Sequence, residues 1–511
     1  MNPNLFRHGL LRGLDSAPAS NTSEGRFGRM FRTLPKAKFD LNFLKALAGI
    51  MAAPKDANPS KETDNPRDDE ENTGISAGYT YLGQFIDHDI TFDPASSLQK
   101  QNDPDSLEDF RTPRFDLDNL YGRGPDDQPY LYQSDGKKLL LSQRKLTGNN
   151  GFDDNTRDLA RNQPDPSDPD PRKRAIIGDP RNDENVIVSQ LQGMFIRFHN
   201  RMVDFMPTAS FQEVQRAVRW HYQWVIFHDF LPTIIGKDTM KSIFPKLKNN
   251  TGLGTELPVL HFFQPHKRPF MPVEFSVAAY RFGHSMVRPE YRLNTTLPDR
   301  FDIFNLKNDD TSLTGFRQFP DVWAIDWRLF FDFGNKPDQF SKFRIQPAYK
   351  IDTSLVNPLK ELPPSIASMI GNLAERNLIR GNTMGLPTGQ DVARAMGIPV
   401  IKDKFLKVGK AIKDDQDKNK SYTEIPGAVA GKAPLWFYVL AEAQQQFETN
   451  DTPIHLGPVG GRIVGEVFAG LLIGDSHSWL SQDPTWTPEA SFLNTKGEFG
   501  IADLLNQAKL G

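Results

Sequence analysis

The stretch Gly83–Ile90 reads Gly-Gln-Phe-Ile-Asp-His-Asp-Ile and sets four polar side chains among apolar ones. On a helix, which turns by about 100° per residue, Gln84 and His88 share a face that Asp87 borders. Asp89 points away from that face. The amide, carboxylate and imidazole could converge on a cofactor, while the lone carboxylate is a hard oxygen ligand suited to Ca²⁺. A hydrogen-bonded core histidine explains this octapeptide equally well, so the choice depends on later segments.

Length and composition bound the class of protein. The chain has 511 residues, of which 38% are hydrophobic and 24% charged, so it can bury a large core in one large domain or several smaller ones. Its net charge of −3 gives no electrostatic reason to expect a nucleic-acid partner. Because there is no cysteine, disulfides, thiolate haem ligation, zinc thiolate sites and iron-sulfur clusters are excluded. Any metal must be held by histidine, carboxylate or carbonyl groups.

The N-terminal region predicts an arm followed by one domain. Residues 17–25 are small and polar, and residues 58–72 are almost entirely charged, Pro or Asn. We therefore expect a partly extended arm over 1–73, with one helix in 39–53 packed on the body, and a single domain over 74–511.

No segment predicts a membrane span or a classical export signal. The apolar pair Leu10-Leu11 is too short for the core of a signal peptide. The best apolar run, residues 464–474, is short and contains Glu466. We expect a monomer that is cytoplasmic, or secreted without a classical signal peptide.

A second oxygen-rich stretch covers residues 112–122. Thr112, Asp116 and Asp118 are close enough along an irregular loop to offer hydroxyl, carbonyl and carboxylate oxygens, as calcium loops do. Asp-rich turns also arise from turn chemistry alone, so this loop by itself leaves calcium open.

Helical periodicity dominates the rest of the chain. Apolar positions over 186–205 recur at helical spacing, and Arg181 and Glu184 at the start of this helix can face the same side. A surface ion pair at a capped helix is the alternative. A second helix is expected over 211–230, ended by Pro232.

A further helix is expected over 273–287, opened by Pro272. In it Arg281 and His284 are one turn apart, and Gly283 removes bulk so that a flat ligand could approach the imidazole. A buried histidine with a local carbonyl partner is the alternative. Other helices are expected over 373–380, 433–447 and 460–473. The fold class is therefore mainly α, with long loops and little β structure.

These blocks together resemble the animal-type haem peroxidases, the peroxidase-cyclooxygenase superfamily. They match it in order, at residues 83–89, 112–122, 181–184 and 281–284, and then at Asn377, Arg380 and residues 385–387. The resemblance implies a myeloperoxidase-like helical fold. The missing cysteines suggest a bacterial member.

The resemblance also implies roles for residues on the two faces of haem b. His88 corresponds to the distal base, Arg181 to the distal arginine and Gln84 to the pocket glutamine. His284 corresponds to the proximal ligand of the haem iron. Asn377 corresponds to the asparagine that bonds to the proximal histidine. Arg281 and Arg380 correspond to the arginines that bind the haem propionates. Asp87 and Glu184 correspond to the carboxylates that form ester bonds to haem.

By the same resemblance calcium would be held by Asp89, Thr112, Arg114 through its carbonyl, Asp116 and Asp118. Two departures limit the match. Asn185 stands where some members carry a methionine bonded to haem, which excludes that link. The cyclooxygenase branch needs a tyrosine at position 281, and Tyr280 lies one residue earlier on a different helical face.

The function that the resemblance implies is oxidation of small phenols or halides by hydrogen peroxide through an oxyferryl intermediate. The alternatives are a haem-dependent fatty-acid oxygenase of the same superfamily and a haem- or calcium-binding protein without turnover.

Overall fold

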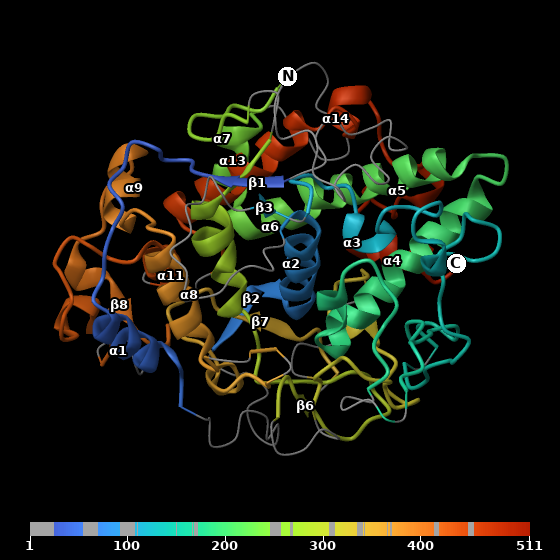
Figure 1. Ribbon diagram of the computed structural model, residues 1–511, viewed down its shortest axis with the longest axis horizontal. Helices are drawn as coiled ribbons and strands as arrows, with labels where there is room; N and C mark the ends of the chain where they lie inside the picture. Colours follow the sequence, from blue (N-terminus) through green and yellow to red (C-terminus); the bar gives the residue numbers. More distant parts are fainter. Residues whose placement is uncertain are drawn as a thin grey trace.

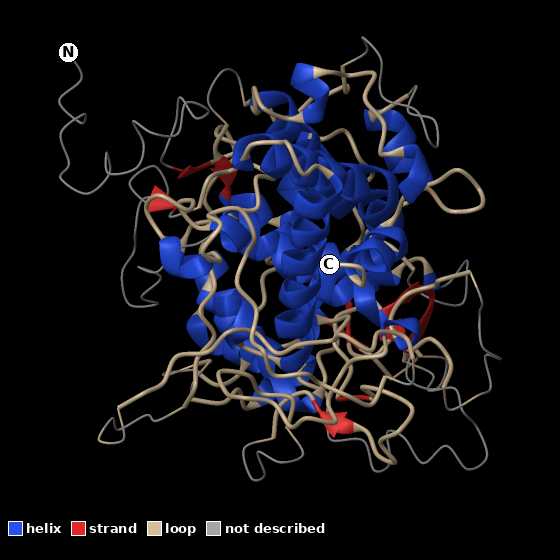
Figure 2. Ribbon diagram, turned by 90° about the vertical axis from the view of Figure 1, so that its right-hand side faces the viewer, coloured by secondary structure: helices blue, strands red, loops and turns tan. Residues whose placement is uncertain are grey.

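The computed structural model describes residues 25–511 apart from 55–69, 92–107, 110, 150, 166, 168–171, 246–256, 266–268, 306–311, 335–340, 342, 365, 368–369, 413–417 and 448–453. Most of the expected arm, residues 1–24 and 55–69, lies outside this part. The fold is mainly helical, as predicted, with loops and a few short strands around the helices (Figure 2).

The α-helices are α1 (Leu41–Met51), α2 (Ala77–Ile90), α3 (Asp118–Tyr121), α4 (Val186–Phe205), α5 (Phe211–Val225), α6 (Leu231–Ile235), α7 (Lys237–Ile243), α8 (Leu373–Thr383), α9 (Gly389–Ala395), α11 (Leu435–Gln444), α13 (Pro458–Gly474), α14 (Trp479–Gln482) and α15 (Ile501–Ala508). Two π-helical turns, η5 (Ile226–Phe230) and η6 (Glu274–Ala278), and two 3₁₀ helices, η4 (Pro180–Asp183) and η7 (Ala279–His284), shape the site.

The strands form small sheets. They are β1 (Gly25–Gly28), β2 (Glu71–Ser76), β3 (Glu108–Asp109), β4 (Met271–Pro272), β5 (Glu290–Tyr291), β6 (Phe301–Asp302), β7 (Pro347–Tyr349), β8 (Lys407–Val408) and β9 (Lys420–Ser421). Strand β1 lies between β3, to which it is antiparallel, and β4, to which it is parallel. The pairs β2–β7, β5–β6 and β8–β9 are antiparallel.

Helix α2, which carries the opening motif, lies near the middle of the molecule beside α4 (Figure 1). Its Phe85 stacks on Phe195 of α4 with ring centroids 4.3 Å apart, and Tyr222 of α5 meets both rings edge-on. All three side chains are buried in one continuous hydrophobic core. Burial of these large rings fixes the rotation of α2 and so the direction of its polar side chains.

The expectation that Pro232 ends the α5 helix is wrong. The chain continues through η5 into α6 and turns away only at Gly236, whose φ of 75° favours glycine. Pro232 lies in the first turn of α6, directly after the π-helical turn η5.

The helix expected over 273–287 takes a different form. The π-helical turn η6 is followed by η7, and the junction residue Ala278 has left the helical region of φ and ψ. A 3₁₀ helix has three residues per turn, so Arg281 and His284 lie directly above one another.

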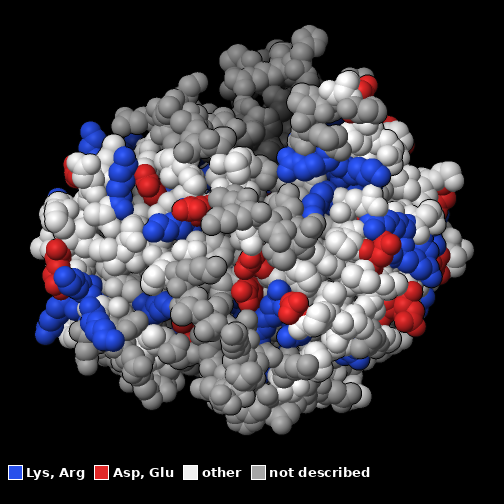
Figure 3. Space-filling view, turned by 90° about the horizontal axis from the view of Figure 1, so that it is seen from below, with Lys and Arg blue, Asp and Glu red and all other residues white. Residues whose placement is uncertain are grey.

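On the face drawn in Figure 3, acidic and basic side chains lie close to one another rather than in separate fields. Among the helices of the described chain, none combines the length and apolar character that a membrane crossing requires.

Candidate active site

His88 is buried, and a neutral amide holds one of its ring nitrogens. Its Nδ1 lies 2.7 Å from Oδ1 of Asn182, whose own Nδ2 donates to Oε1 of Gln192 at 2.9 Å. Because the amide nitrogen of Asn182 is used in this way, its oxygen faces the imidazole and Nδ1 carries the proton. The other nitrogen, Nε2, is then a lone-pair acceptor.

Electrostatics keep this imidazole neutral. Burial, and after it the charge of Arg181, lowers the pKa of His88 to about 4. The Nη2 atom of Arg181 donates to the carbonyls of His88 at 3.0 Å and Thr91 at 2.7 Å, and so holds the C-terminal end of α2. Arg181 also forms an ion pair with Asp179 at 2.7 Å. A neutral base and a fixed positive charge therefore lie side by side.

Gln84, one helical turn before His88, is held from two directions. Its amide nitrogen donates to Glu184, and its oxygen accepts from Nδ2 of Asn185 at 3.2 Å. Burial raises the pKa of Glu184 to about 7, against the opposing charge of Arg181. Asp87 also adds to this rise, so the two carboxylates expected to bond haem lie near each other.

His284, at the end of η7, pairs with α8. Its Nδ1 lies 2.7 Å from Nδ2, the side-chain amide nitrogen of Asn377. A half-turn of that amide exchanges nitrogen for oxygen without changing its shape. The oxygen must face Nδ1 when Nε2 is a metal ligand. Burial, then Arg281 and Arg376, lowers the pKa of His284 to about 3, so it is neutral and able to ligate.

Cationic side chains collect around His284. Burial, and then Arg281, lowers the pKa of Arg376, while Glu184 opposes this. Arg376 and Arg380 are four residues apart on α8 and share a face with each other. Like charges held together in a partly buried region call for anions between them, so this group fits the two propionates of a haem.

The two histidine-bearing segments approach each other. The hydroxyl of Tyr280, in η7, donates to the carbonyl of Gly83, in α2, at 3.2 Å. A Cβ built on Gly283 would meet no described atom within 4 Å, so the space beside His284 is open. The arrangement fits a flat cofactor that one imidazole would ligate and the other would face.

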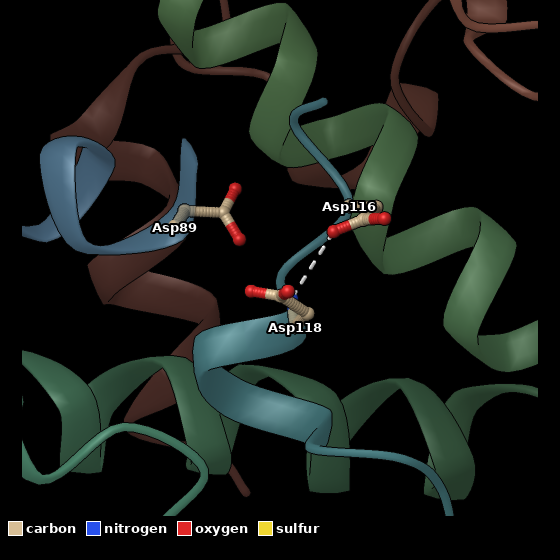
Figure 4. A group of neighbouring side chains, drawn as sticks. All are labelled: Asp89, Asp116 and Asp118. Carbon is tan, nitrogen blue, oxygen red and sulfur yellow. Dashed lines mark hydrogen bonds between the residues drawn. The ribbon is translucent and has the colours of Figure 1, made fainter. Parts of the chain in front are cut away.

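Three carboxylates meet on the other side of α2. Oxygen atoms of Asp89, Asp116 and Asp118 lie within 4.8 Å of one another, and Asp89 points from α2 towards the loop that carries the other two (Figure 4). Asp89 is fully buried, and neither of its carboxylate oxygens has a hydrogen-bond partner in the described chain. Burial, then Asp116 and Asp118, raises the pKa of Asp89 well above its usual range. Such a cluster fits a bound cation.

The loop is shaped for this convergence. Leu117, between the two loop aspartates, is buried with φ of 58° and ψ of 37°, a left-handed conformation unusual for leucine. The hydroxyl of Thr112 donates to Asp116 at 2.6 Å. The backbone N–H of Arg114 donates to the carbonyl of Thr112 at 2.7 Å, which places Arg114 in the same turn. Burial raises the pKa of Asp118 to about 7 against the charge of Arg111.

Sequence reasoning missed four residues of this site. Asn182 orients His88, Asn185 holds Gln84, Arg376 joins the cations near His284, and Asp179 holds Arg181. Three of them left a signal in the sequence. Asn185 is a typical N-cap residue directly before the apolar run of α4. Asp179 precedes Pro180 at a helix start, and Arg376 is one helical turn from Arg380.

Comparison with known proteins identifies the family of this chain. The family model for animal haem peroxidase matches residues 98–489. Thyroid peroxidase of Rattus norvegicus is 24% identical over 378 residues, covering 71% of this chain and 38% of that protein. Chorion peroxidase of Drosophila melanogaster is 28% identical over 237 residues, covering 44% and 26%. The matched regions thus span less than two fifths of the length of either relative.

Solved structures share the fold. Peroxidase A from Dictyostelium discoideum superposes with a TM-score of 0.59 at 16% identity, over 95% of this chain and 93% of that one. A fatty acid alpha-dioxygenase of Arabidopsis thaliana gives 0.53 at 15% identity, over 93% and 75%. The helical fold and the family match define a member of the peroxidase superfamily. Within it, the chain belongs to the animal haem peroxidase family.

Proposed function

We propose that this chain binds haem b between His88 and His284 and uses hydrogen peroxide to oxidise small phenols or halides. The observation that carries the proposal is a pair of neutral imidazoles, His88 buried and His284 half-buried, each held at Nδ1 by an asparagine amide 2.7 Å away. One imidazole is free to act as a base at Nε2 and the other to ligate iron there.

Haem, when bound, would supply the iron that accepts the peroxide oxygen and the oxidising equivalents. His284 would ligate that iron through Nε2, with Asn377 fixing its tautomer. Arg281, Arg376 and Arg380 would pair with the propionates. Asp87 and Glu184 would form the ester bonds, a point that mass spectrometry of acid-extracted haem before and after peroxide treatment tests.

On the peroxide side, Nε2 of His88 takes a proton from hydrogen peroxide and returns it to the oxygen that departs as water. Arg181 lowers the energy of the negative charge that develops on the departing oxygen, because its own position is already fixed. Gln84, clamped from two sides, holds small ligands or water beside the imidazole. Each group is therefore in place before peroxide arrives.

The test is haem binding and peroxide-dependent turnover. The purified protein supplied with haem should show a Soret band and oxidise guaiacol or bromide when peroxide is added. His88→Ala should keep the band and lose about 10²- to 10⁴-fold in rate, as expected for loss of a general acid-base. His261→Ala, which changes an exposed histidine, is the matched control. A His88→Ala rate equal to the control would refute the mechanism, and a Soret band without turnover would indicate a haem-binding protein.

Calcium would be held by Asp89, Asp116, Asp118, the Thr112 hydroxyl and the Arg114 carbonyl. The unpartnered, buried Asp89 supports this assignment, because an isolated buried carboxylate is costly unless a cation pairs with it. The ion would tie α2 to the loop and so fix His88, the next residue along the helix.

A second candidate is a haem-dependent oxygenase acting on fatty acids. The fold shared with the fatty acid alpha-dioxygenase supports it, and Tyr280, whose hydroxyl donates to the Gly83 carbonyl, is the tyrosine that such an oxygenase would use. Tyr280→Phe should then abolish turnover of an unsaturated fatty acid and leave peroxidation intact. Equal loss of both activities would count against this candidate.

A further inference from the structure

The carboxylate of Asp179 holds two guanidinium groups at once. It is fully buried. Its Oδ1 accepts from the backbone N–H of Arg181 at 2.9 Å and from Nε of the same residue at 3.1 Å. Its Oδ2 accepts from Nη2 of Arg181 at 2.7 Å and from Nη2 of Arg111 at 2.6 Å. Asp179 therefore sets the position of Arg181 and shares its charge with a second arginine.

Arg111 links this carboxylate to the three-aspartate cluster. Its Nη1 lies 3.3 Å from Oδ1 of Asp118, while its Nε and Nη2 face Asp179. Its side chain is only 11% exposed, so water screens these pairs weakly. An ion pair between Asp118 and Arg111, and the hydrogen-bonded pairs of Arg111 and Arg181 with Asp179, thus run without a gap from Asp118 to Arg181.

We infer that Asp179 and Arg111 are positioning residues that couple the calcium site to the distal arginine. This inference rests on the proposed function. A cation bound by Asp118 partly neutralises the carboxylate that otherwise attracts Arg111. Arg111 then depends more on Asp179, and Asp179 holds Arg181 less tightly. Since coupling between two sites is reciprocal, an anion bound beside Arg181 also changes calcium affinity.

The experiment measures cyanide binding to the haem protein, because bound cyanide is an anion that Arg181 would stabilise. Its dissociation constant is read from the Soret shift, in calcium and after chelation, and calcium affinity is measured by calorimetry with and without cyanide. In the parent protein calcium should change the cyanide constant by about fivefold or more, a typical allosteric coupling. In Asp179→Asn the change should fall below twofold while calcium still binds.

Two further variants keep the result interpretable. Arg111→Lys keeps the positive charge but loses the guanidinium N–H groups that reach both Asp118 and Asp179, so it should retain only part of the coupling. This variant can be measured even if Asp179→Asn fails to fold. Asp153→Asn removes another buried aspartate that pairs with an arginine, Arg197, and should keep the full coupling. Full coupling in both Asp179→Asn and Arg111→Lys would overturn the inference, as would its loss in Asp153→Asn. Absence of any Soret band would overturn the proposed function as well.

Discussion

Asn182→Ala gives a direct test of how His88 is held. The substitution deletes the acceptor 2.7 Å from Nδ1 and the donor to Gln192 at 2.9 Å, in a side chain that is fully buried. The imidazole can then carry its proton on either nitrogen. Only the form with the proton on Nδ1 leaves Nε2 able to accept a proton from peroxide.

The size of the effect follows from the lost hydrogen bond. Leaving a buried donor without its partner costs about 1 to 3 kcal/mol. About 1.4 kcal/mol corresponds to a tenfold change in rate, so the reaction with peroxide should slow by roughly 5- to 150-fold in the Asn182 variant. Haem content should stay the same, because His284 and the cationic side chains near it are untouched.

The assay is stopped-flow absorbance of the Soret band after mixing with peroxide. Asn200→Ala is the matched control, because Asn200 is also buried and makes two bonds, to the backbone N–H of Leu139 at 2.8 Å and to its carbonyl at 3.0 Å. Both variants should lose stability, but only Asn182→Ala should react slowly. If the two react equally fast, Asn182 does not set the tautomer of His88.

Three other changes have expected outcomes. Asp89→Asn should lower calcium content and haem content together, measured by metal analysis and the Soret band; loss of calcium with full haem content would contradict the coupling. Arg376→Ala should weaken haem binding without moving the Soret maximum, read by haem titration, whereas unchanged affinity would remove Arg376 from the propionate site. Burial raises the pKa of Glu442 to about 7 from an ordinary 4.5, so the unfolded chain loses this proton at lower pH and stability falls as pH rises between these values. Between pH 5 and pH 8 the free energy of unfolding of Glu442→Gln, measured with denaturant, should fall by up to about 3 kcal/mol less than that of the parent protein. Parallel curves of unfolding free energy against pH for the two proteins would contradict this.

Local sequence patterns predicted two helices that pack against α2, which carries His88. Helical spacing gave α4 and α5, and the polar order of the opening motif placed Asp89 on the opposite side of α2 from His88. These features depend on neighbours within one or two turns, which the sequence displays directly.

Contacts between distant segments could not be predicted in this way. Asn182 meets His88 across 94 positions in the chain, and nothing local distinguishes it from any polar residue of a turn. The irregular helices were also hidden. The π-helical turn before Pro232 depends on how the chain packs after α5, so the general rule that proline ends a helix failed there.

The pattern of charge around the two imidazoles explains why amides hold them. A carboxylate at Nδ1 would favour the protonated ring and raise its pKa, which would remove the base at His88. Asn182 fixes the proton on Nδ1 of His88 without raising the pKa of the ring. Asn377 can do the same for His284 after a half-turn of its amide. The charged residues lie beyond the asparagines. Arg181 and Asp179 shift the pKa of His88, and Arg376 shifts the pKa of His284. The asparagines therefore orient the imidazole rings, whereas the charged residues set the electrostatic field around them. Substitution of an asparagine and substitution of a charged residue should for this reason change the kinetics in different ways.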